Sequence, residues 1–279
     1  MTTLATTTAD SLTMLRRNLL HQIRYPGLYG FVIGIPVVLL LLFVYVFGGT
    51  LGAGLPAGLP GGAAGLSGGA AGEAGHPVQA YLAYVLPGIL LIAIAGIANG
   101  ASIGIAMDLT EGIVARFRSM AISRAAVLTG HVLGNTIQGA IATAAVVAVA
   151  LLMGLRPTAG PVGWLVIAGL LVLASFAVSW LGVALGVSAG SVEAASNTPM
   201  VLLLFVFLSG GFVPPSSMPG WLQGFARYQP FSTFTEAIRA LLFGRGPGSD
   251  LWLALGWGVL LALAGYVWAR ALYARKSVR

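Results

Sequence analysis

Six stretches of this chain are long enough to cross a lipid bilayer, and none of them contains an Asp, Glu, Lys or Arg. A hydrocarbon core about 30 Å thick requires a helix of about 20 mainly apolar residues. The pattern therefore predicts an all-α membrane protein with six transmembrane helices. The predicted spans cover residues 31–50, 81–107, 125–153, 163–187, 197–213 and 251–269.

The charge-free spans also bear on the energy source. Ion-driven pumps and transporters usually carry ionisable residues inside the membrane, so this chain is a poor candidate for driving transport by itself. Only 8% of its residues are charged, against about 25% in soluble domains, which excludes a packed water-soluble domain. The spans and their connections use most of the length, so residues 1–279 are predicted to form a single membrane domain.

The basic residues predict the orientation. The net charge of +7 does not indicate nucleic-acid binding, because the Lys and Arg residues flank the spans and form no patch with interleaved aromatics. Ten lie in the N-terminal segment, the loop between the second and third spans, and the tail, whereas four lie on the other side. The positive-inside rule therefore places both termini in the cytoplasm. The abundance of Arg, Ala and Gly is typical of a GC-rich bacterial genome, which predicts a multi-pass protein of a bacterial plasma membrane.

Two segments flank the first span. Residues Leu12, Leu15, Leu19 and Ile23 recur at helical spacing, which predicts either an interfacial helix on the inner membrane surface or a cytosolic helix packed on another subunit. After the first span, residues 48–79 are rich in glycine and carry one charge. We predict a flexible external loop there, because such a segment buries too little side chain to offset its ordering entropy.

Small and polar residues mark candidate helix contacts. Two glycine ladders at four-residue spacing predict close helix packing, within the chain or across a dimer. In the third span, His131, Asn135 and Gln138 share one helical face. With Asn99 of the second span they are candidates for hydrogen bonds between helices or for a polar pathway. The ladders are Gly96, Gly100 and Gly104 in the second span, and Gly182, Gly186 and Gly190 in the fourth.

No catalytic or metal-binding motif is present. The chain has no cysteine, no His-Glu-x-x-His sequence and no Gly-x-Ser-x-Gly sequence. A nucleotide-binding phosphate loop needs Gly-Lys-Ser/Thr at its end, and the only lysine, Lys276, follows Arg275. We therefore predict no catalytic residue, no metal and no cofactor in this chain, and no ATP hydrolysis by the chain alone.

The loop between the second and third spans is the most informative polar segment. Residues 108–124 alternate charged and apolar side chains, which predicts a short amphipathic helix, with Glu111 favoured at its N-terminus. Arg116 and Phe117 are suited to insertion into a groove on a cytosolic partner. The alternative is an ordinary charged loop that only sets the topology, and residue types do not decide between the two.

A second short amphipathic segment precedes the last span. Aromatic and aliphatic residues accumulate over 221–242 without reaching spanning length, which predicts an external helix that is either re-entrant or interfacial. Pro230 supplies a start signal, Gly244 a stop, and Glu236 is spaced to pair with Arg239. A re-entrant helix would lie beside a pathway, because irregular backbone at membrane depth needs protein or a wet cavity around it.

Two of these segments carry a family resemblance. Residues 111–124, Glu-Gly-Ile-Val-Ala-Arg-Phe-Arg-Ser-Met-Ala-Ile-Ser-Arg, resemble the coupling loop of type-2 ATP-binding-cassette (ABC) exporter permeases, especially the daunorubicin-resistance permease group. Gly-Gly-Phe-Val-Pro at 210–214 and Tyr-Gln-Pro-Phe-Ser at 228–232 are similar to that family's segment before its last span. The resemblance covers essentially the whole chain, with two departures, Ala121 for Pro and Gln229 for Asn.

The resemblance implies a division of labour. A pair of permeases, either a homodimer or two related chains, would bind two cytosolic ABC ATPase subunits that hold ATP-Mg. The coupling helix would dock on the ATPase, and the external helices would shape the outer exit. The residues implied for coupling are Glu111, Arg116, Phe117, Arg118 and Arg124, and those of the external helix are Gln229, Pro230, Glu236 and Arg239.

These observations predict a permease of an ATP-driven exporter, with membrane lipid and no nucleic acid among its contacts. Spans without fixed charges favour a hydrophobic or amphiphilic cargo such as a drug, an antibiotic or a lipid. One alternative is export of a polysaccharide or lipid-linked glycan, for which an aromatic lining is expected. The scattered residues Trp164, Trp180, Trp252, Trp257 and Trp268 are more typical of interfacial belts. Another alternative is a non-transporting anchor that recruits a cytosolic protein.

Overall fold

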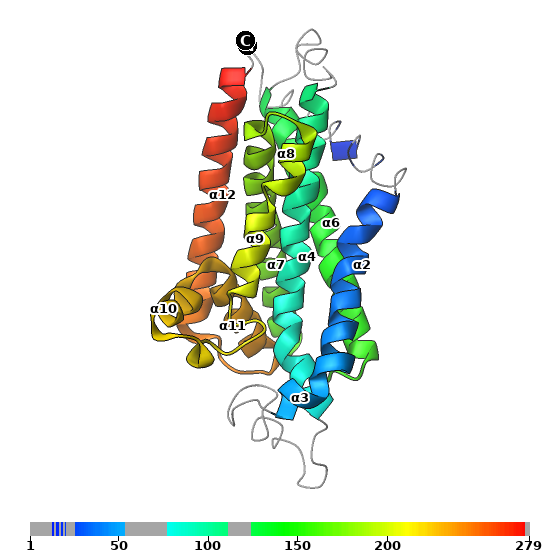
Figure 1. Ribbon diagram of the computed structural model, residues 1–279, viewed down its shortest axis with the longest axis vertical. Coiled ribbons are helices and arrows are strands. Elements are labelled where there is room, and N and C mark those ends of the chain that lie inside the picture. The colour runs from blue at the N-terminus through cyan, green and yellow to red at the C-terminus, as the bar shows by residue number, and fades with distance from the viewer. Residues whose placement is uncertain are drawn as a thin grey trace.

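The protein is a bundle of long helices in a computed structural model. The structure describes residues 26–53, 77–110 and 124–276, together with Thr13, Leu15, Arg16, Asn18 and Leu20. Within these residues every regular element is helical (Figure 1). The elements are α2 (Pro26–Leu42), the π-helix η1 (Phe43–Phe47), α3 (Gly48–Ala53), α4 (Pro77–Thr110), α6 (Arg124–Leu152), α7 (Pro161–Ser188), α8 (Val192–Asn197), α9 (Met200–Phe207), the 3-10 helix η2 (Pro215–Ser217), α10 (Gly220–Tyr228), α11 (Pro230–Leu242) and α12 (Gly248–Lys276).

Five of the described helical segments are long and apolar enough to cross a membrane. They correspond to five of the six spans predicted from the sequence. The first and third lie within the predicted ranges, and the other three extend beyond the predicted range at both ends. The segments are Val32–Thr50, Val78–Thr110, Leu128–Leu152, Pro161–Ser188 and Gly248–Arg275.

The sixth predicted span, residues 197–213, is not one continuous helix. Its apolar residues form α9, which has 8 residues, and α9 follows the short helix α8 after a break at Thr198 and Pro199. Pro199 lacks an amide hydrogen, so it cannot continue the hydrogen-bond ladder of α8. Together α8 and α9 reach about 24 Å at 1.5 Å per residue, which is less than the thickness of a bilayer core.

Helix α4 is the centre of the bundle (Figure 1). It contacts α2, α3, α6, α7, α8, α9 and α11, and its apolar residues are almost completely buried. Helix α12 lies at one edge, packed on α7 and α11. The bundle therefore has two ends. The C-terminal end is where α12 finishes and α2 begins, and the opposite end holds α3, α10 and α11 (Figure 1).

Small residues permit the closest helix contacts. A Cβ added at Gly182 of α7 would lie 2.5 Å from the backbone oxygen of Ala98 in α4, and one added at Gly186 would lie 2.8 Å from the Cα of Ser102. In a membrane, helix association depends on such close van der Waals packing, since lipid is as apolar as the helices themselves. The second glycine ladder therefore packs within the chain at Gly182 and Gly186. A Cβ added at its third member, Gly190, would meet no atom of the described residues within 4 Å.

The first ladder lies on another face of α4. A Cβ at Gly104 would meet the ring of His131 at 3.5 Å, and one at Gly100 would meet the Asn135 side chain at 4.0 Å. At Gly96 a Cβ would meet no atom of the residues that the structure describes within 4 Å. This face therefore borders α6, and the distance from the added Cβ to α6 increases from Gly104 to Gly96.

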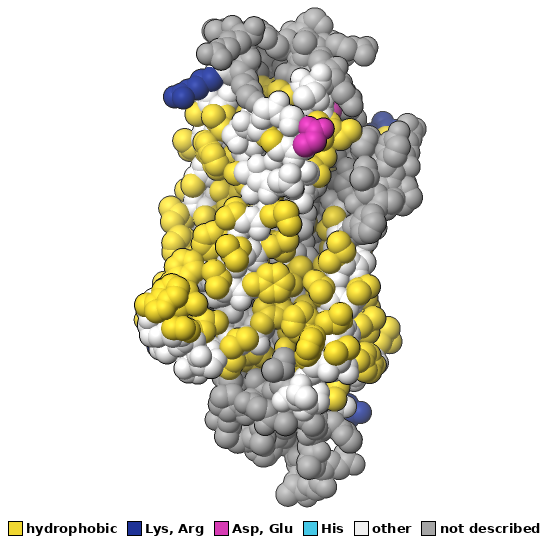
Figure 2. Space-filling model, viewed as in Figure 1, with side chains coloured by type: hydrophobic (Ala, Val, Ile, Leu, Met, Phe, Trp, Pro, Cys, Tyr) yellow, Lys and Arg dark blue, Asp and Glu magenta, His cyan; other side chains and the backbone are white. Residues whose placement is uncertain are grey.

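Exposed side chains on the bundle are largely apolar. In Figure 2 hydrophobic side chains cover the middle of the visible face, and the charged side chains of the described residues lie toward its two ends. Exposed residues of α9 include Met200, Leu204 and Phe207. A wide apolar band bounded by charge is typical of a surface that faces lipid.

The interior holds a buried charge and one residue whose predicted role needs correction. Arg239, which lies outside the predicted spans, is 1% exposed. Trp180 is also buried and packs edge-on against Tyr266, with ring centroids 5.0 Å apart. It is therefore a core residue and not part of an interfacial belt.

Several predicted segments lie wholly or partly outside the described residues. The predicted coupling residues Glu111, Arg116, Phe117 and Arg118 are outside, whereas Arg124 begins α6. At the two ends of the predicted glycine-rich loop, 48–53 and 77–79 are helical, and 54–76 are not described. The five described residues before α2 are helical, as the N-terminal spacing predicted.

Candidate functional site: two polar clusters in the bundle

The first cluster is centred on a buried arginine in α11. This helix begins at Pro230, as predicted, and it packs against α4, α7 and α12. Its last turn carries Arg239, and Gly244 follows the helix with φ of +64°, a left-handed conformation that favours glycine. The predicted start and stop signals therefore hold, and the packing of α11 against α4, α7 and α12 buries the Arg239 side chain.

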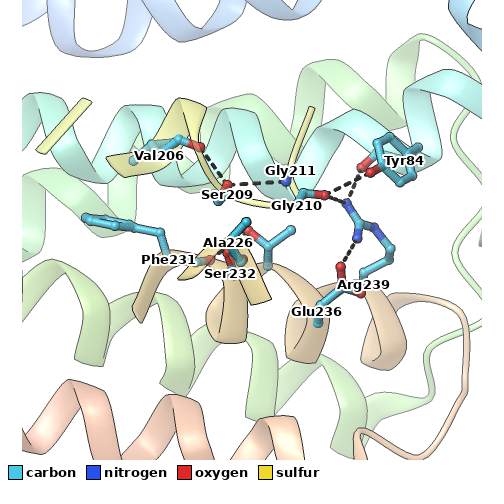
Figure 3. A network of polar contacts seen from close by, with 11 residues as sticks. Tyr84, Val206, Ser209, Gly210, Gly211, Ala226, Phe231, Ser232, Glu236 and Arg239 are labelled. Carbon is cyan, nitrogen blue, oxygen red and sulfur yellow. Dashed lines mark hydrogen bonds and ion pairs between the residues drawn. The ribbon is translucent and has the colours of Figure 1, made fainter. Parts of the chain in front are cut away.

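The guanidinium of Arg239 donates hydrogen bonds to three residues, Tyr84, Gly210 and Glu236 (Figure 3). Its Nη1 donates to Glu236 Oε1 at 2.5 Å, and its Nη2 donates to the backbone oxygens of Tyr84 at 3.0 Å and Gly210 at 2.9 Å. The guanidinium carbon also lies 4.2 Å from the centre of the Tyr84 ring. We refer to Tyr84, Gly210, Glu236 and Arg239 as the arginine cluster.

These contacts compensate for burying the charge. A buried charge is tolerated only when it is paired and hydrogen-bonded. Glu236 supplies the opposite charge, the two carbonyls accept hydrogen bonds, and the Tyr84 ring adds a cation–π contact. The Glu236 side chain is 38% exposed, so the ion pair lies where the buried cluster meets the surface.

The turn after α9 is held against α4 by the same cluster. Tyr84 Oη donates to the Gly210 oxygen at 2.9 Å (Figure 3). A Cβ added at Gly211 would lie 2.8 Å from the Cα of Gly88, and one at Gly88 would lie 3.0 Å from the Gly211 oxygen. Backbone therefore meets backbone at this point, with no space for a side chain on either partner.

The other end of the α8–α9 segment is also attached to α4. Ser102 Oγ donates to the backbone oxygen of Ala195 in α8 at 2.8 Å. Ser102 and Gly88 are separated by about 21 Å along α4 at 1.5 Å per residue. The α8–α9 segment thus runs along α4 and is fixed near both of its ends.

The second cluster, which we call the polar row, lies between α4 and α6 toward the C-terminal end. His131 Nε2 and Asp108 Oδ2 are 2.9 Å apart, and Asn135 Nδ2 donates to the His131 backbone oxygen at 2.8 Å. The row comprises Asn99 and Asp108 of α4 with His131, Asn135 and Gln138 of α6.

Two amide side chains of the polar row have buried atoms without a hydrogen-bond partner in the described part of the chain. Gln138 is buried and neither of its amide atoms has a hydrogen-bond partner there, and the same holds for the buried Oδ1 of Asn99. Buried polar groups are usually satisfied. Among the described residues, the row therefore combines the interhelical contact between His131 and Asp108 with buried amide atoms that have no hydrogen-bond partner.

Gln229 is a third buried amide. It occupies the N-cap position of α11, is 4% exposed, and makes no side-chain cap. Neither of its side-chain atoms has a hydrogen-bond partner among the described residues. Ser232 instead links α11 to α10 by donating to the backbone oxygen of Ala226 (Figure 3).

The structure brings some of the predicted site residues together, and it adds partners that the sequence did not indicate. Glu236 pairs with Arg239 as the spacing predicted, but that pair lies far along α4 from the polar row, near Tyr84 and not near Asp108. Sequence reasoning missed Tyr84 as a partner. Within the described residues no group of three or more His, Cys, Asp or Glu could hold a metal ion.

Comparison with known proteins bears on the whole chain. Residues 10–243 match the family model of the ABC-2 type transporter. The chain is 29% identical over 252 residues to the daunorubicin resistance ABC transporter permease protein DrrB1 of Streptomyces coeruleorubidus, covering 90% of this chain and 81% of that protein. It is 27% identical over 161 residues to the probable doxorubicin resistance ABC transporter permease protein DrrC of Mycobacterium tuberculosis, covering 56% of this chain and 58% of that protein. The multi-pass helical bundle and the extent of the family match agree, and the chain belongs to the ABC-2 type transporter family.

Proposed function

We propose that this chain is the membrane permease of an ATP-driven exporter that moves an amphiphilic drug, antibiotic or lipid out of a bacterial cell. The observation that carries the proposal is the family match over residues 10–243, together with drug-resistance permeases among the relatives. The chain has no phosphate-loop sequence, so the energy would come from a separate ATPase.

The cargo class rests on two observations. The relatives are named for resistance to daunorubicin and doxorubicin, and the five long helices present mainly apolar surface. A pathway along such helices suits an amphiphile better than an ion or a free sugar. Daunorubicin is therefore a suitable transport probe.

The proposed assembly contains two permeases, as a homodimer or with a related chain, and two ABC ATPase subunits that hold ATP-Mg. Ten of the fourteen Lys and Arg residues belong to the N-terminal segment, the loop between α4 and α6, and the C-terminal segment. Because α2 begins and α12 finishes at the C-terminal end of the bundle (Figure 1), we assign that end to the cytoplasm of a plasma membrane by the positive-inside rule. In this orientation α10, α11 and the arginine cluster lie toward the outside.

Coupling would pass through residues 111–124. In the proposed assembly, Arg116 and Phe117 insert into a groove on the ATPase, with Glu111, Arg118 and Arg124 beside them. ATP binding would draw the two ATPase subunits together, and this segment would pass the movement to α4 and α6, the two helices that it connects.

The test uses inverted membrane vesicles that contain the chain and its ATPase. We expect ATP-dependent daunorubicin accumulation, and we expect Arg116→Glu to abolish both accumulation and co-purification of the ATPase. Arg275→Glu, at the basic end of α12, is the matched control and should retain both. Loss of ATPase binding with no cargo movement in any variant would instead indicate a non-transporting anchor. Movement of a lipid-linked glycan but not of daunorubicin would indicate a glycan exporter.

A further inference from the structure

We propose that Arg239 is a latch that holds the outer ends of α9 and α11 against α4 and must release for the exit to open. The inference rests on the proposed function for its transport consequence, and on the geometry of the arginine cluster for the latch itself. Arg239 joins three segments that are distant in sequence, since its acceptors Tyr84 and Gly210 lie 155 and 29 residues away.

The acceptors decide what the latch connects. The Tyr84 oxygen belongs to α4 and the Gly210 oxygen to the turn after α9. Both are backbone atoms, so the positions of the two segments are set by the main chain and not by flexible side chains. The planar fork of an arginine donates in fixed directions, which makes its two Nη2 contacts sensitive to a shift of either segment.

Among the described residues, side-chain hydrogen bonds attach the α8–α9 segment to α4 at two places, which differ in strength. The Ser102 attachment near the C-terminal end is one neutral hydrogen bond. The arginine cluster combines a charged donor, an ion pair and the Tyr84 hydroxyl. Hydrogen bonds with a charged partner are about twice as strong as neutral ones, so the arginine cluster is the main attachment of this segment to α4.

Glu236 provides the means of release. Its carboxylate is the counter-charge of Arg239 in the described part of the chain, and its side chain is 38% exposed whereas that of Arg239 is 1% exposed. When the pair separates, the buried guanidinium loses its compensation and its burial becomes unfavourable. A movement that pulls Glu236 toward water would therefore release Arg239 from both carbonyls together.

The latch can be tested without any cargo. The chain has no cysteine, so spin labels at Gln79→Cys and Gln223→Cys report the distance from the outer end of α4 to α10. Both positions are exposed. In full-length protein in lipid nanodiscs we expect one main distance for the wild type. In Arg239→Gln and in Glu236→Gln a second, longer distance should be at least about tenfold more populated, which corresponds to a change of 1.4 kcal/mol in the equilibrium.

Controls separate release of the latch from general unfolding. Labels at Gln79→Cys and Gly160→Cys, on α4 and at the start of α7, should keep their distance in the same variants. Arg227→Gln removes an exposed arginine at the end of α10 and should leave both distances unchanged. Arg239→Lys keeps the charge without the fork, so it should give a population between those of the wild type and Arg239→Gln.

The inference is overturned if Arg239→Gln and Glu236→Gln have the wild-type distance between α4 and α10, or if the α4–α7 distance changes equally. The effect of the latch on transport is measured separately, in proteoliposomes that contain the chain and its ATPase. We expect Glu236→Gln to consume more ATP per daunorubicin moved than the wild type. Latch release in a chain that exports nothing would support the latch and reject the proposed function.

Discussion

Tyr84 and Arg239 share one acceptor. The hydroxyl of Tyr84 and Nη2 of Arg239 each donate to the backbone oxygen of Gly210, both at 2.9 Å, and the guanidinium lies over the Tyr84 ring. One carbonyl of the turn after α9 is thus bound to α4 and to α11 at once. This shared acceptor makes Tyr84 a stabilising contact that can be measured apart from Arg239.

Tyr84→Phe should lower the free energy of unfolding by about 0.5–1.5 kcal/mol, because it removes one buried hydrogen bond and keeps the ring under the guanidinium. Tyr81→Phe is the matched control, since the buried Tyr81 hydroxyl has no partner among the described residues. It should be neutral or slightly stabilising. Denaturant unfolding in detergent micelles measures both, and equal losses would contradict this account.

Gly186→Ala should destabilise the bundle by about 1–3 kcal/mol, the usual cost of overpacking. The added methyl would press on the backbone of Ser102 in α4, and helix backbone cannot yield as a side-chain tip can. In Gly190→Ala, in the same ladder, the added methyl meets no described atom within 4 Å and should cost nothing measurable. Thermal unfolding midpoints of the two variants give the comparison, and a loss at both positions would show that the ladder matters for another reason.

Gln229→Asn should stabilise the protein relative to Gln229→Ala by about 1 kcal/mol, the usual effect of an N-cap side chain. Gln229 has extended backbone angles at the N-cap of α11, and its side chain makes no cap hydrogen bond. The shorter asparagine side chain is suited to accept from a backbone amide of the first turn, as N-cap residues do. The two variants remove the same glutamine, so their difference isolates the cap. Identical unfolding midpoints would show that asparagine does not cap α11.

Asp108 and His131 should show a coupling energy of roughly 0.6–1.7 kcal/mol in a double-mutant cycle, the range found for interhelical hydrogen bonds in membranes. The cycle combines Asp108→Asn with His131→Ala. A cycle of His131→Ala with Gln138→Leu is the control and should give no coupling, because Gln138 has no partner in the described residues. A coupling of zero for the first pair would mean that the 2.9 Å contact contributes nothing to stability.

The sequence predicted local features well where a short pattern decides the structure. Five spans follow from apolar runs alone, and the pair of Glu236 with Arg239 follows from their spacing on one helix. The sixth span was predicted as continuous because its residues are apolar, although Pro199 already marked the break.

Long-range contacts could not be predicted in the same way. The acceptors of Arg239 are backbone oxygens, which every residue carries, so nothing in the residue types at 84 or 210 indicated them. The spacing of Gly182 and Gly186 predicted a close approach of two helices, but it did not indicate that Ala98 and Ser102 would be the contacting residues. Burial of Arg239 was missed for the same reason, since it depends on how α11 packs against three other helices.

The central claim is that an ATPase outside the lipid drives transport through this chain. It is tested most directly by measuring uphill daunorubicin uptake into inside-out proteoliposomes that contain the purified chain, with and without its ATPase. The account predicts uptake only when both the ATPase and ATP-Mg are present, and no change when proton and sodium gradients are collapsed. Uphill uptake by the chain alone on a proton or sodium gradient would contradict it.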